Sequence, residues 1–175
     1  MSLVKRINDS IRDVIDFPKE GITFKDITPI LKDPVLSSDI TDEIINELPS
    51  NVTHIAGIES RGFLFGFPVS IKNQTPFILI RKKGKLPCKT VSLKYDLEYG
   101  NAEIEMHVDS VCPGDKVVIH DDLLATGGTA FAAAELIKSQ GADVVGFSFV
   151  VELAFLNGRK LLLEHSSNIN SIVEY

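Results

Sequence analysis

Apolar residues near the start of the chain repeat every three or four positions. This spacing predicts an amphipathic helix over residues 3–15, ended by the breakers Pro18 and Gly21. The same spacing predicts a second helix over about 36–48, ended by Pro49. The apolar positions that carry the two helices are Leu3, Ile7, Ile11, Val14 and Ile15, and then Leu36, Ile40, Ile44, Ile45 and Leu48.

From residue 52 onward, runs typical of strands alternate with runs typical of helices. A helix is predicted where Phe63, Phe67 and Ile71 share one face, and another over 129–140. This alternation predicts an α/β fold, with a mainly parallel central sheet flanked by helices. Such sheets bind ligands beyond the carboxyl ends of their strands. The strands are predicted at 52–58, 76–80, 102–108, 116–120 and 144–151, of which 102–108 alternates strictly and is expected to be half-exposed.

One long stretch, residues 81–101, shows neither pattern and mixes Lys, Tyr and Glu. A connection of this length in a compact domain is typically either functional or disordered. We expect a flexible lid loop over 81–101, part of which forms its own hairpin.

The composition is that of an ordinary globular chain: 175 residues, 44% apolar and 24% charged, which fits one domain. A net charge of −6 argues against a surface that binds nucleic acid, and no apolar run is long enough to span a membrane. The N-terminus is charged and lacks a signal-peptide core, so we expect a cytoplasmic protein. Cys88 and Cys112 lie far apart and outside any Cys/His pattern, which is typical of reduced cysteines without a redox or metal role.

Three segments with candidate chemistry follow predicted strands: GIESRG, RKKGK and HDDLLATGGT. Because the strands are expected to be parallel, the three segments should meet at one edge of the sheet. RKKGK, residues 81–85, is the densest basic cluster in an acidic chain and indicates a local anion site. A solvated loop has the same composition, so this cluster alone does not decide.

The glycine turn ATGGT, residues 125–129, links a predicted strand to a predicted helix. Gly127 and Gly128 let the backbone turn with its N–H groups facing inward, and Thr126 and Thr129 add hydroxyl groups. The helix N-terminus adds partial positive charge, so the turn can bind a phosphate without a cationic side chain. A plain strand-to-helix turn is the alternative. The patterns of a nucleoside-triphosphate loop and of a dinucleotide site are both absent.

Asp121 and Asp122 lie within short chain reach of this turn, where they would repel a phosphate. They therefore serve another part of the same ligand, such as vicinal hydroxyls, a metal or developing positive charge. A ribose 5-phosphate fits, with its phosphate in the turn and its 2- and 3-hydroxyls on the acids. A metal-binding acid pair, as in phosphoryl-transfer sheets, is the alternative.

The stretch VVIHDDLLATGGT, residues 117–129, resembles the phosphoribosyl-pyrophosphate (PRPP) signature of the type I phosphoribosyltransferases. Four further segments resemble the adenine phosphoribosyltransferases, in the same order and over nearly the whole chain: FPKEGITFKDITPIL, GIESRGFLFG, LIRKKGKLP and YDLEYGNAEIE. The resemblance implies the type I phosphoribosyltransferase fold with a small N-terminal hood over about 1–35. It also implies transfer of the phosphoribosyl group of PRPP to adenine, which gives AMP and pyrophosphate in purine salvage.

The resemblance implies roles for individual residues. Asp121 and Asp122 stabilise the oxocarbenium-like ribose through its hydroxyls. Glu98, beside Tyr99 in the lid, handles a proton at the imidazole edge of adenine, and lid closure excludes water. The 5′-phosphate is expected at Ala125, Thr126, Gly127, Gly128 and Thr129; pyrophosphate at Glu59, Ser60, Arg61, Gly62, Arg81, Lys82 and Lys85; and adenine at Thr23, Phe24, Lys25 and Leu153.

Further implications concern the cofactor, the backbone and the assembly. Mg²⁺ is the implied cofactor, held mainly by substrate oxygens rather than by protein side chains. A non-proline cis peptide bond is implied in the turn 59–62. The family works as a homodimer in which Arg81 or its neighbours reach the partner's site. Lys25 departs from the family, which commonly has arginine there, and lysine lacks the forked donors of arginine. His120 is expected to point to the other strand face as a structural residue.

Two other functions stay open. The same fold acting on another base, such as hypoxanthine, guanine or orotate, is disfavoured by the hood segment FPKEGITFKDI. A non-catalytic regulator that binds PRPP and controls transcription would keep residues 121–129, but with a DNA-binding helix-turn-helix or a degraded lid. This chain has an intact DLEYG and we expect no appended domain.

Overall fold

Seven strands form the central sheet in the computed structural model, which describes residues 1–17, 19–96 and 101–175. Their order across the sheet is β5-β6-β4-β3-β7-β8-β9. The strands β4, β3, β7, β8 and β9 are parallel, while β6 pairs antiparallel with β4 and β5 antiparallel with β6. The predicted mainly parallel sheet is thus confirmed. The strands span His54–Ile58 (β3), Phe77–Lys82 (β4), Thr90–Asp96 (β5), Asn101–His107 (β6), Lys116–Leu124 (β7), Asp143–Glu152 (β8) and Ile169–Glu174 (β9).

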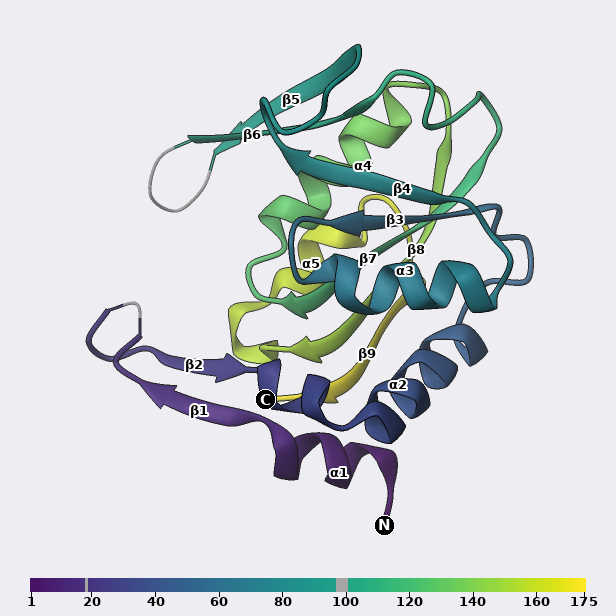
Figure 1. Ribbon diagram of the computed structural model, residues 1–175. Helices are drawn as coiled ribbons and strands as arrows, with labels where there is room; N and C mark the ends of the chain where they lie inside the picture. The colour runs from purple at the N-terminus through teal and green to yellow at the C-terminus, as the bar shows by residue number, and fades with distance from the viewer. Residues whose placement is uncertain (18, 97–100) are drawn as a thin grey trace.

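Helices cover both faces of the sheet (Figure 1). One face packs against α1, α2 and α3 and the other against α4 and α5. Neighbouring strand residues point to opposite faces, so that Ile55 joins the first core and Ala56 the second. The helices span Leu3–Ser10 (α1), Pro34–Asn46 (α2), Gly62–Lys72 (α3), Gly128–Lys138 (α4) and Gly158–Leu162 (α5), with short 3₁₀ turns at Thr28–Lys32 (η1) and Ala154–Leu156 (η2). Within the described residues no helix is long and apolar enough to cross a membrane.

The predicted helix over 3–15 is wrong in its second half. Helix α1 ends at Ser10, and Arg12–Ile15 forms strand β1, which pairs antiparallel with β2, Thr23–Asp26. Arg12 lies opposite Asp26 in this pairing, and its guanidinium donates two hydrogen bonds to the buried Asp26 carboxylate. This pairing favours the strand over a last turn of helix. The hairpin belongs to the predicted hood and projects beyond the sheet (Figure 1).

The stretch 81–101 is more regular than predicted. Arg81 and Lys82 end β4, and residues 90–96 form β5, which pairs along its whole length with β6. The expected hairpin is therefore present on both sides of residues 97–100, which lie outside the described residues. Strand β6 is not half-exposed, because Ile104, Glu105 and Met106 are all buried. The buried Glu105 carboxylate accepts hydrogen bonds from the backbone of residues 85 and 86 and from Thr90, which offsets its desolvation.

Helix α3 contains the predicted residues Phe63, Phe67 and Ile71, but its buried face is not the one that they mark. Phe65 and Val69 pack in the core, whereas Phe67 and Ile71 are 53% and 62% exposed. An apolar strip of α3 therefore faces outward.

Candidate active site at the strand ends

Three predicted segments meet at one edge of the sheet. Strands β4, β3 and β7 are neighbours and parallel, so their carboxyl ends lie together. Each carries one segment at its carboxyl end: 81–85 begins in the last two residues of β4, 59–62 follows β3 and 125–129 follows β7. The two hairpins, β1–β2 and β5–β6, project beyond this same edge, one on each side (Figure 1).

A cavity of about 630 Å³ opens at this edge. Its floor is apolar, from Ile58, Ile80 and Ile104, and its walls carry charged and hydroxyl groups. This combination suits a polar ligand whose anionic part is bound by specific side chains. The predicted site residues that line it are Glu59, Arg81, Lys82, Asp121 and Thr129. Lys83, from the predicted basic cluster 81–85, lines it as well, together with Tyr95, Asn101, Ala102 and Glu103, for which no role was predicted.

The turn after β3 approaches β7 very closely. The peptide bond between Glu59 and Ser60 is cis, which confirms the expectation for this turn. A Cβ atom on Gly62 would lie 2.7 Å from the carbonyl oxygen of His120 and 3.0 Å from Oδ1 of Asp121. Only glycine allows this approach, and it brings the start of α3 against the acidic pair.

The basic segment divides into residues that face the cavity and one that does not. Arg81, Lys82 and Lys83 line the cavity, whereas Lys85 does not. The Arg81 guanidinium donates from Nε to Glu59 Oε2 at 2.9 Å and from Nη1 to the Lys85 carbonyl at 3.1 Å. Burial raises the pKa of Glu59, but the hydrogen bonds from Arg81 and the Lys82 amide outweigh it and hold this pKa below its ordinary value. Glu59 is thus an ionised carboxylate that positions Arg81.

The two aspartates point in different directions. They are consecutive in β7, so their side chains leave opposite faces of the strand. Asp121 lines the cavity with Thr129, while Asp122, 3% exposed, faces Arg61. The Arg61 Nε lies 2.9 Å from Asp122 Oδ2 as an ion pair without hydrogen-bond geometry, and this buried oxygen accepts no hydrogen bond.

Burial dominates the electrostatics of this pair. It raises the pKa of both carboxyls, and the neighbouring Asp122 charge raises the pKa of Asp121 further. Arg61 offsets part of the rise for Asp122. An electron-deficient or cationic group entering the cavity would therefore be stabilised by Asp121, because it would replace the missing solvation of the carboxylate.

The glycine turn has the geometry of an anion site. Gly127 has a φ of +84° and no side chain caps α4 there, so the first amides of this helix are free for a ligand. Thr129 faces the cavity, and its Oγ1 accepts a hydrogen bond of 3.1 Å from the Tyr95 hydroxyl. With its oxygen engaged as an acceptor, the Thr129 hydroxyl can donate its own proton to an anion.

Neighbouring hood residues in β2 make different contacts: Phe24 lies near the acidic pair, whereas Lys25 contacts Asp13 and Tyr175. The ring of Phe24 packs edge-on against Phe17 and lies 5.2 Å from the Arg61 guanidinium, which connects β2 to the acidic pair. Lys25 instead forms an ion pair of 2.7 Å with Asp13 and lies 4.0 Å from the ring centre of Tyr175. Its ammonium is held by this chain's own residues. Thr23 is exposed and Leu153 half-buried behind the end of β8.

Two expected catalytic residues, Glu98 and Tyr99, lie outside the described residues. His120 is 1% exposed, contacts Ser148 at 3.2 Å, and has a pKa lowered by burial to about 4, as expected for a structural histidine. Lys83 belongs to the basic cluster that the sequence marked, whereas Tyr95 belongs to no phosphate pattern and reaches the cavity only because β5 folds beside it.

The comparisons with known proteins agree with this geometry. Residues 30–170 match the family model of the phosphoribosyl transferase domain. The chain is 51% identical over 173 residues to the adenine phosphoribosyltransferase of Agathobacter rectalis, covering 98% of both chains. It superimposes on the crystal structure of adenine phosphoribosyltransferase from Thermoanaerobacter pseudethanolicus with a TM-score of 0.94 and 44% identity, covering 99% of this chain and 100% of that one.

A more distant relative was solved with ligands. The Trypanosoma brucei adenine phosphoribosyl transferase, in complex with AMP, pyrophosphate and ribose-5-phosphate, has a TM-score of 0.86 and 27% identity, over 98% of this chain and 79% of that one. Because the family model covers most of the chain and the similarity to named relatives extends from end to end, the chain belongs to the adenine phosphoribosyltransferase family.

Proposed function

We propose that this chain transfers the 5-phosphoribosyl group of PRPP to adenine and releases AMP and pyrophosphate. The observation that carries the proposal is one cavity at the start of α4, in a chain of the adenine phosphoribosyltransferase family. The cavity is lined by Thr129 of the glycine turn, by Asp121, and by the cations Arg81, Lys82 and Lys83. PRPP has a part for each: a 5′-phosphate, a ribose and a pyrophosphate. The Trypanosoma brucei relative binds the corresponding fragments, which supports the assignment.

The reaction breaks the bond between ribose C1 and a pyrophosphate oxygen and forms a bond from C1 to N9 of adenine. The bonding pair leaves with pyrophosphate, and adenine loses its N9 proton. Positive charge develops on the ribose in between, and Asp121, facing the cavity, stabilises it through the ribose hydroxyls. Asp122 does not face the cavity; its role is to hold Arg61 in place at the start of α3.

The leaving pyrophosphate needs positive charge. Arg81, Lys82 and Lys83 supply it at the cavity wall, with Arg81 aimed by Glu59. Lys85 does not line the cavity, but its carbonyl accepts a hydrogen bond from Arg81 and its amide donates one to Glu105, so its backbone helps to position Arg81. In the proposed assignment, Ser60 and Gly62 shape the turn 59–62, which follows β3 next to these cations.

Mg²⁺ is the cofactor we propose, bound to substrate oxygens. Among the described residues no cluster of three acidic, histidine or cysteine side chains could hold a metal alone, so a ligand-borne ion fits better. Asp121 is a half-buried carboxylate that faces the cavity and could contact the hydration shell of the ion. When bound, Mg²⁺ neutralises charge on the pyrophosphate.

Adenine is proposed to bind beside the hood, between Phe24 and Leu153, with Glu98 taking the N9 proton. Since a positioned carboxyl typically contributes about 10²–10⁴-fold, Glu98→Gln should lower kcat by about that factor and change substrate affinity little. An unchanged kcat would remove Glu98 from the mechanism.

The active assembly is proposed to be a homodimer. The family resemblance implies it, and the exposed apolar strip on α3, which starts directly after the 59–62 turn, offers a surface for a second copy beside the site. A cytoplasmic location stays a prediction from the sequence.

The test is nucleotide formation with one base at a time. The chain is incubated with PRPP, Mg²⁺ and either adenine, hypoxanthine, guanine or orotate, and products are separated by chromatography. AMP from adenine alone is the expected result. Nucleotide from another base only would make this a phosphoribosyltransferase of different specificity, and PRPP binding without any product would favour the regulator.

A further inference from the structure

The phosphate turn at residues 125–127 has little support from its own side chains. Thr126 is exposed, Gly127 has the positive φ described above, and no side chain caps the helix that follows. A turn with these properties has several accessible shapes when isolated, since glycine restricts the backbone least. Something outside the turn must therefore select the shape that binds a phosphate.

The segment after β8 provides a contact at this place. A Cβ atom on Gly158 would lie 2.1 Å from the carbonyl oxygen of Ala125 and 2.9 Å from the amide nitrogen of Gly127. Reciprocally, a Cβ atom on Gly127 would lie 2.8 Å from the Gly158 carbonyl oxygen. Two glycines thus let two backbones touch, and the first residue of α5 lies directly against the turn.

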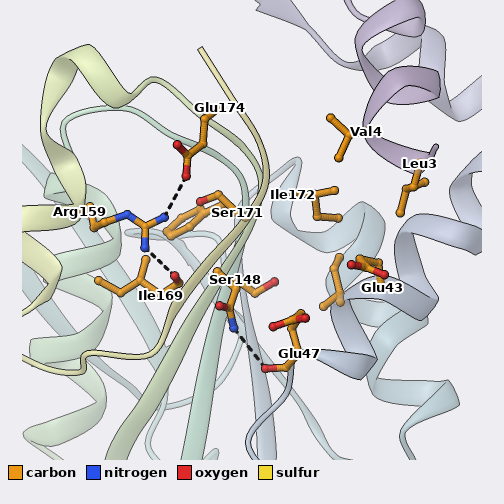
Figure 2. Close-up of a pocket in the computed structure, with 13 residues that line it drawn as sticks. Leu3, Val4, Glu43, Glu47, Ser148, Arg159, Ile169, Ser171, Ile172 and Glu174 are labelled. Carbon is orange, nitrogen blue, oxygen red and sulfur yellow. Dashed lines mark hydrogen bonds and ion pairs between the residues drawn. The ribbon is translucent and has the colours of Figure 1, made fainter.

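The neighbouring Arg159 holds the backbone of Gly158 in position. Its guanidinium donates from Nε to Glu152 Oε1 at 3.1 Å, makes a second contact with the other Glu152 oxygen, and donates from Nη1 to the Ile169 carbonyl at 2.6 Å. Figure 2 shows the same side chain reaching Glu174 as well, at 3.6 Å. Arg159 therefore ties the start of α5 to the ends of β8 and β9.

The Glu152–Arg159 pair is built to stay in one geometry. Glu152 is 4% exposed and also accepts a hydrogen bond of 2.7 Å from Ser171. A bidentate pair of this kind has a defined orientation, and removing one partner would leave a buried charge without compensation. The pocket in Figure 2, about 380 Å³, lies on the outer side of Arg159 and shares no lining residue with the strand-end cavity.

We propose that Gly158 and Arg159 are positioning residues for the 5′-phosphate of PRPP. Arg159, held by Glu152, presses the backbone of Gly158 against residues 125–127 and keeps the amides of this turn directed at the phosphate. The inference rests on the proposed function and adds to it two residues, Gly158 and Arg159, that contact no reacting atom. It predicts an effect on PRPP that adenine does not share.

The variants are Gly158→Ala, which introduces the 2.1 Å overlap, and Arg159→Lys, which keeps a charge but not the fork. Gly146→Ala is the matched control. Gly146 lies in β8, and a Cβ atom there would lie 3.0 Å from the Asn168 side-chain nitrogen, away from residues 125–127. For each variant we would measure KM for PRPP, KM for adenine, kcat, thermal stability, and ribose 5-phosphate binding by calorimetry.

We expect Gly158→Ala to raise KM for PRPP and weaken ribose 5-phosphate binding by about tenfold or more, the scale of one lost charged hydrogen bond. KM for adenine should stay within about twofold, and Arg159→Lys should show a smaller shift of the same kind. Gly146→Ala should lower stability only.

An equal rise of both KM values, or an unchanged KM for PRPP in Gly158→Ala at normal stability, would overturn the inference. If Gly158→Ala does not fold, Arg159→Lys decides alone by the same two KM values. Failure of the wild-type chain to form AMP would instead overturn the proposed function, and ribose 5-phosphate binding would still report on the turn.

Discussion

At the scale of single residues, Asp121 is a carboxyl whose ionised form the fold disfavours. Its pKa is raised by burial and by the Asp122 charge. A group with a raised folded pKa contributes its stability at low pH, and this contribution is lost as the pH rises from the unfolded value, about 3.9, through the folded one. Ionisation of Asp121, as the pH rises through its folded pKa, therefore destabilises the ligand-free protein.

Asp121→Asn should then be more stable but less active. The amide keeps an oxygen for the Asp122 amide, which now donates to Asp121 Oδ1 at 2.9 Å. We expect Tm at pH 8 to rise by about 2–4 °C, the effect of about 1 kcal/mol in a chain of this size, and the gain to shrink toward pH 4. The value of kcat should fall about 10²-fold, because a developing charge loses its preorganised partner.

Scanning calorimetry at several pH values, with initial rates at saturating substrate, measures both effects. Asp109→Asn is the control, since Asp109 is an exposed aspartate in the turn after β6 and its substitution should change neither Tm nor kcat. A lower Tm for Asp121→Asn at pH 8 would mean that the ionised carboxylate stabilises the fold.

Site residues can be predicted from the sequence where they lie close together along the chain. Asp121, Gly127 and Thr129 belong to one strand-turn-helix unit, so their spacing alone predicts that they meet. Tyr95 and Gly158 reach the same turn only after the chain has folded. No spacing pattern marks such contacts, because they depend on which strand ends become neighbours.

At the scale of elements, strand β5 is linked to helix α4 by one hydrogen bond across the cavity. The Tyr95 hydroxyl donates to Thr129 Oγ1, and residues 97–100 follow β5 directly. Tyr95→Phe removes this donor and keeps the ring, so Thr129 loses its orienting partner. A net hydrogen bond contributes about 1 kcal/mol, so we expect KM for PRPP to rise about fivefold, with KM for adenine unchanged.

Initial rates with each substrate varied in turn check this prediction. The same change made in a Thr129→Val background should have no further effect if the hydrogen bond is the cause, because the two groups act as one unit. Full additivity of the two substitutions would show that Tyr95 acts by another route.

The elements themselves were predictable where one period dominated. Strands β3, β7 and β8 and helix α4 show long runs of one kind and were found within a few residues. Residues 12–15 were assigned to the wrong type, since two adjacent apolar residues, Val14 and Ile15, satisfy both periods. Their strand depends on pairing with residues 23–26, and no local pattern reports a partner eight residues farther along.

At the scale of the whole molecule, the distribution of exposed apolar side chains distinguishes a monomer from a dimer. Phe67 and Ile71 are large, exposed and adjacent on α3, with the half-exposed Leu64 one turn earlier. Exposed apolar side chains that gather in one patch mark interaction sites more often than scattered ones. Because α3 begins at Gly62, a second copy bound there would lie next to the pyrophosphate turn, where Arg81 or its neighbours could reach it.

Phe67→Glu should therefore convert the protein from a dimer to a single chain of 19.2 kDa, measured by sedimentation velocity. A buried unpaired carboxylate at each copy of the interface costs several kcal/mol, which shifts the dissociation constant by several orders of magnitude.

Leu163→Glu is the matched control, since Leu163 is 54% exposed against 53% for Phe67 but lies at the end of α5, on the other face of the sheet. A wild-type chain that sediments as a monomer would rule out the dimer, and a dimer that survives Phe67→Glu would place the interface elsewhere. If the partner's cations contribute to the site, kcat should fall in parallel with the dimer fraction, while Leu163→Glu keeps both.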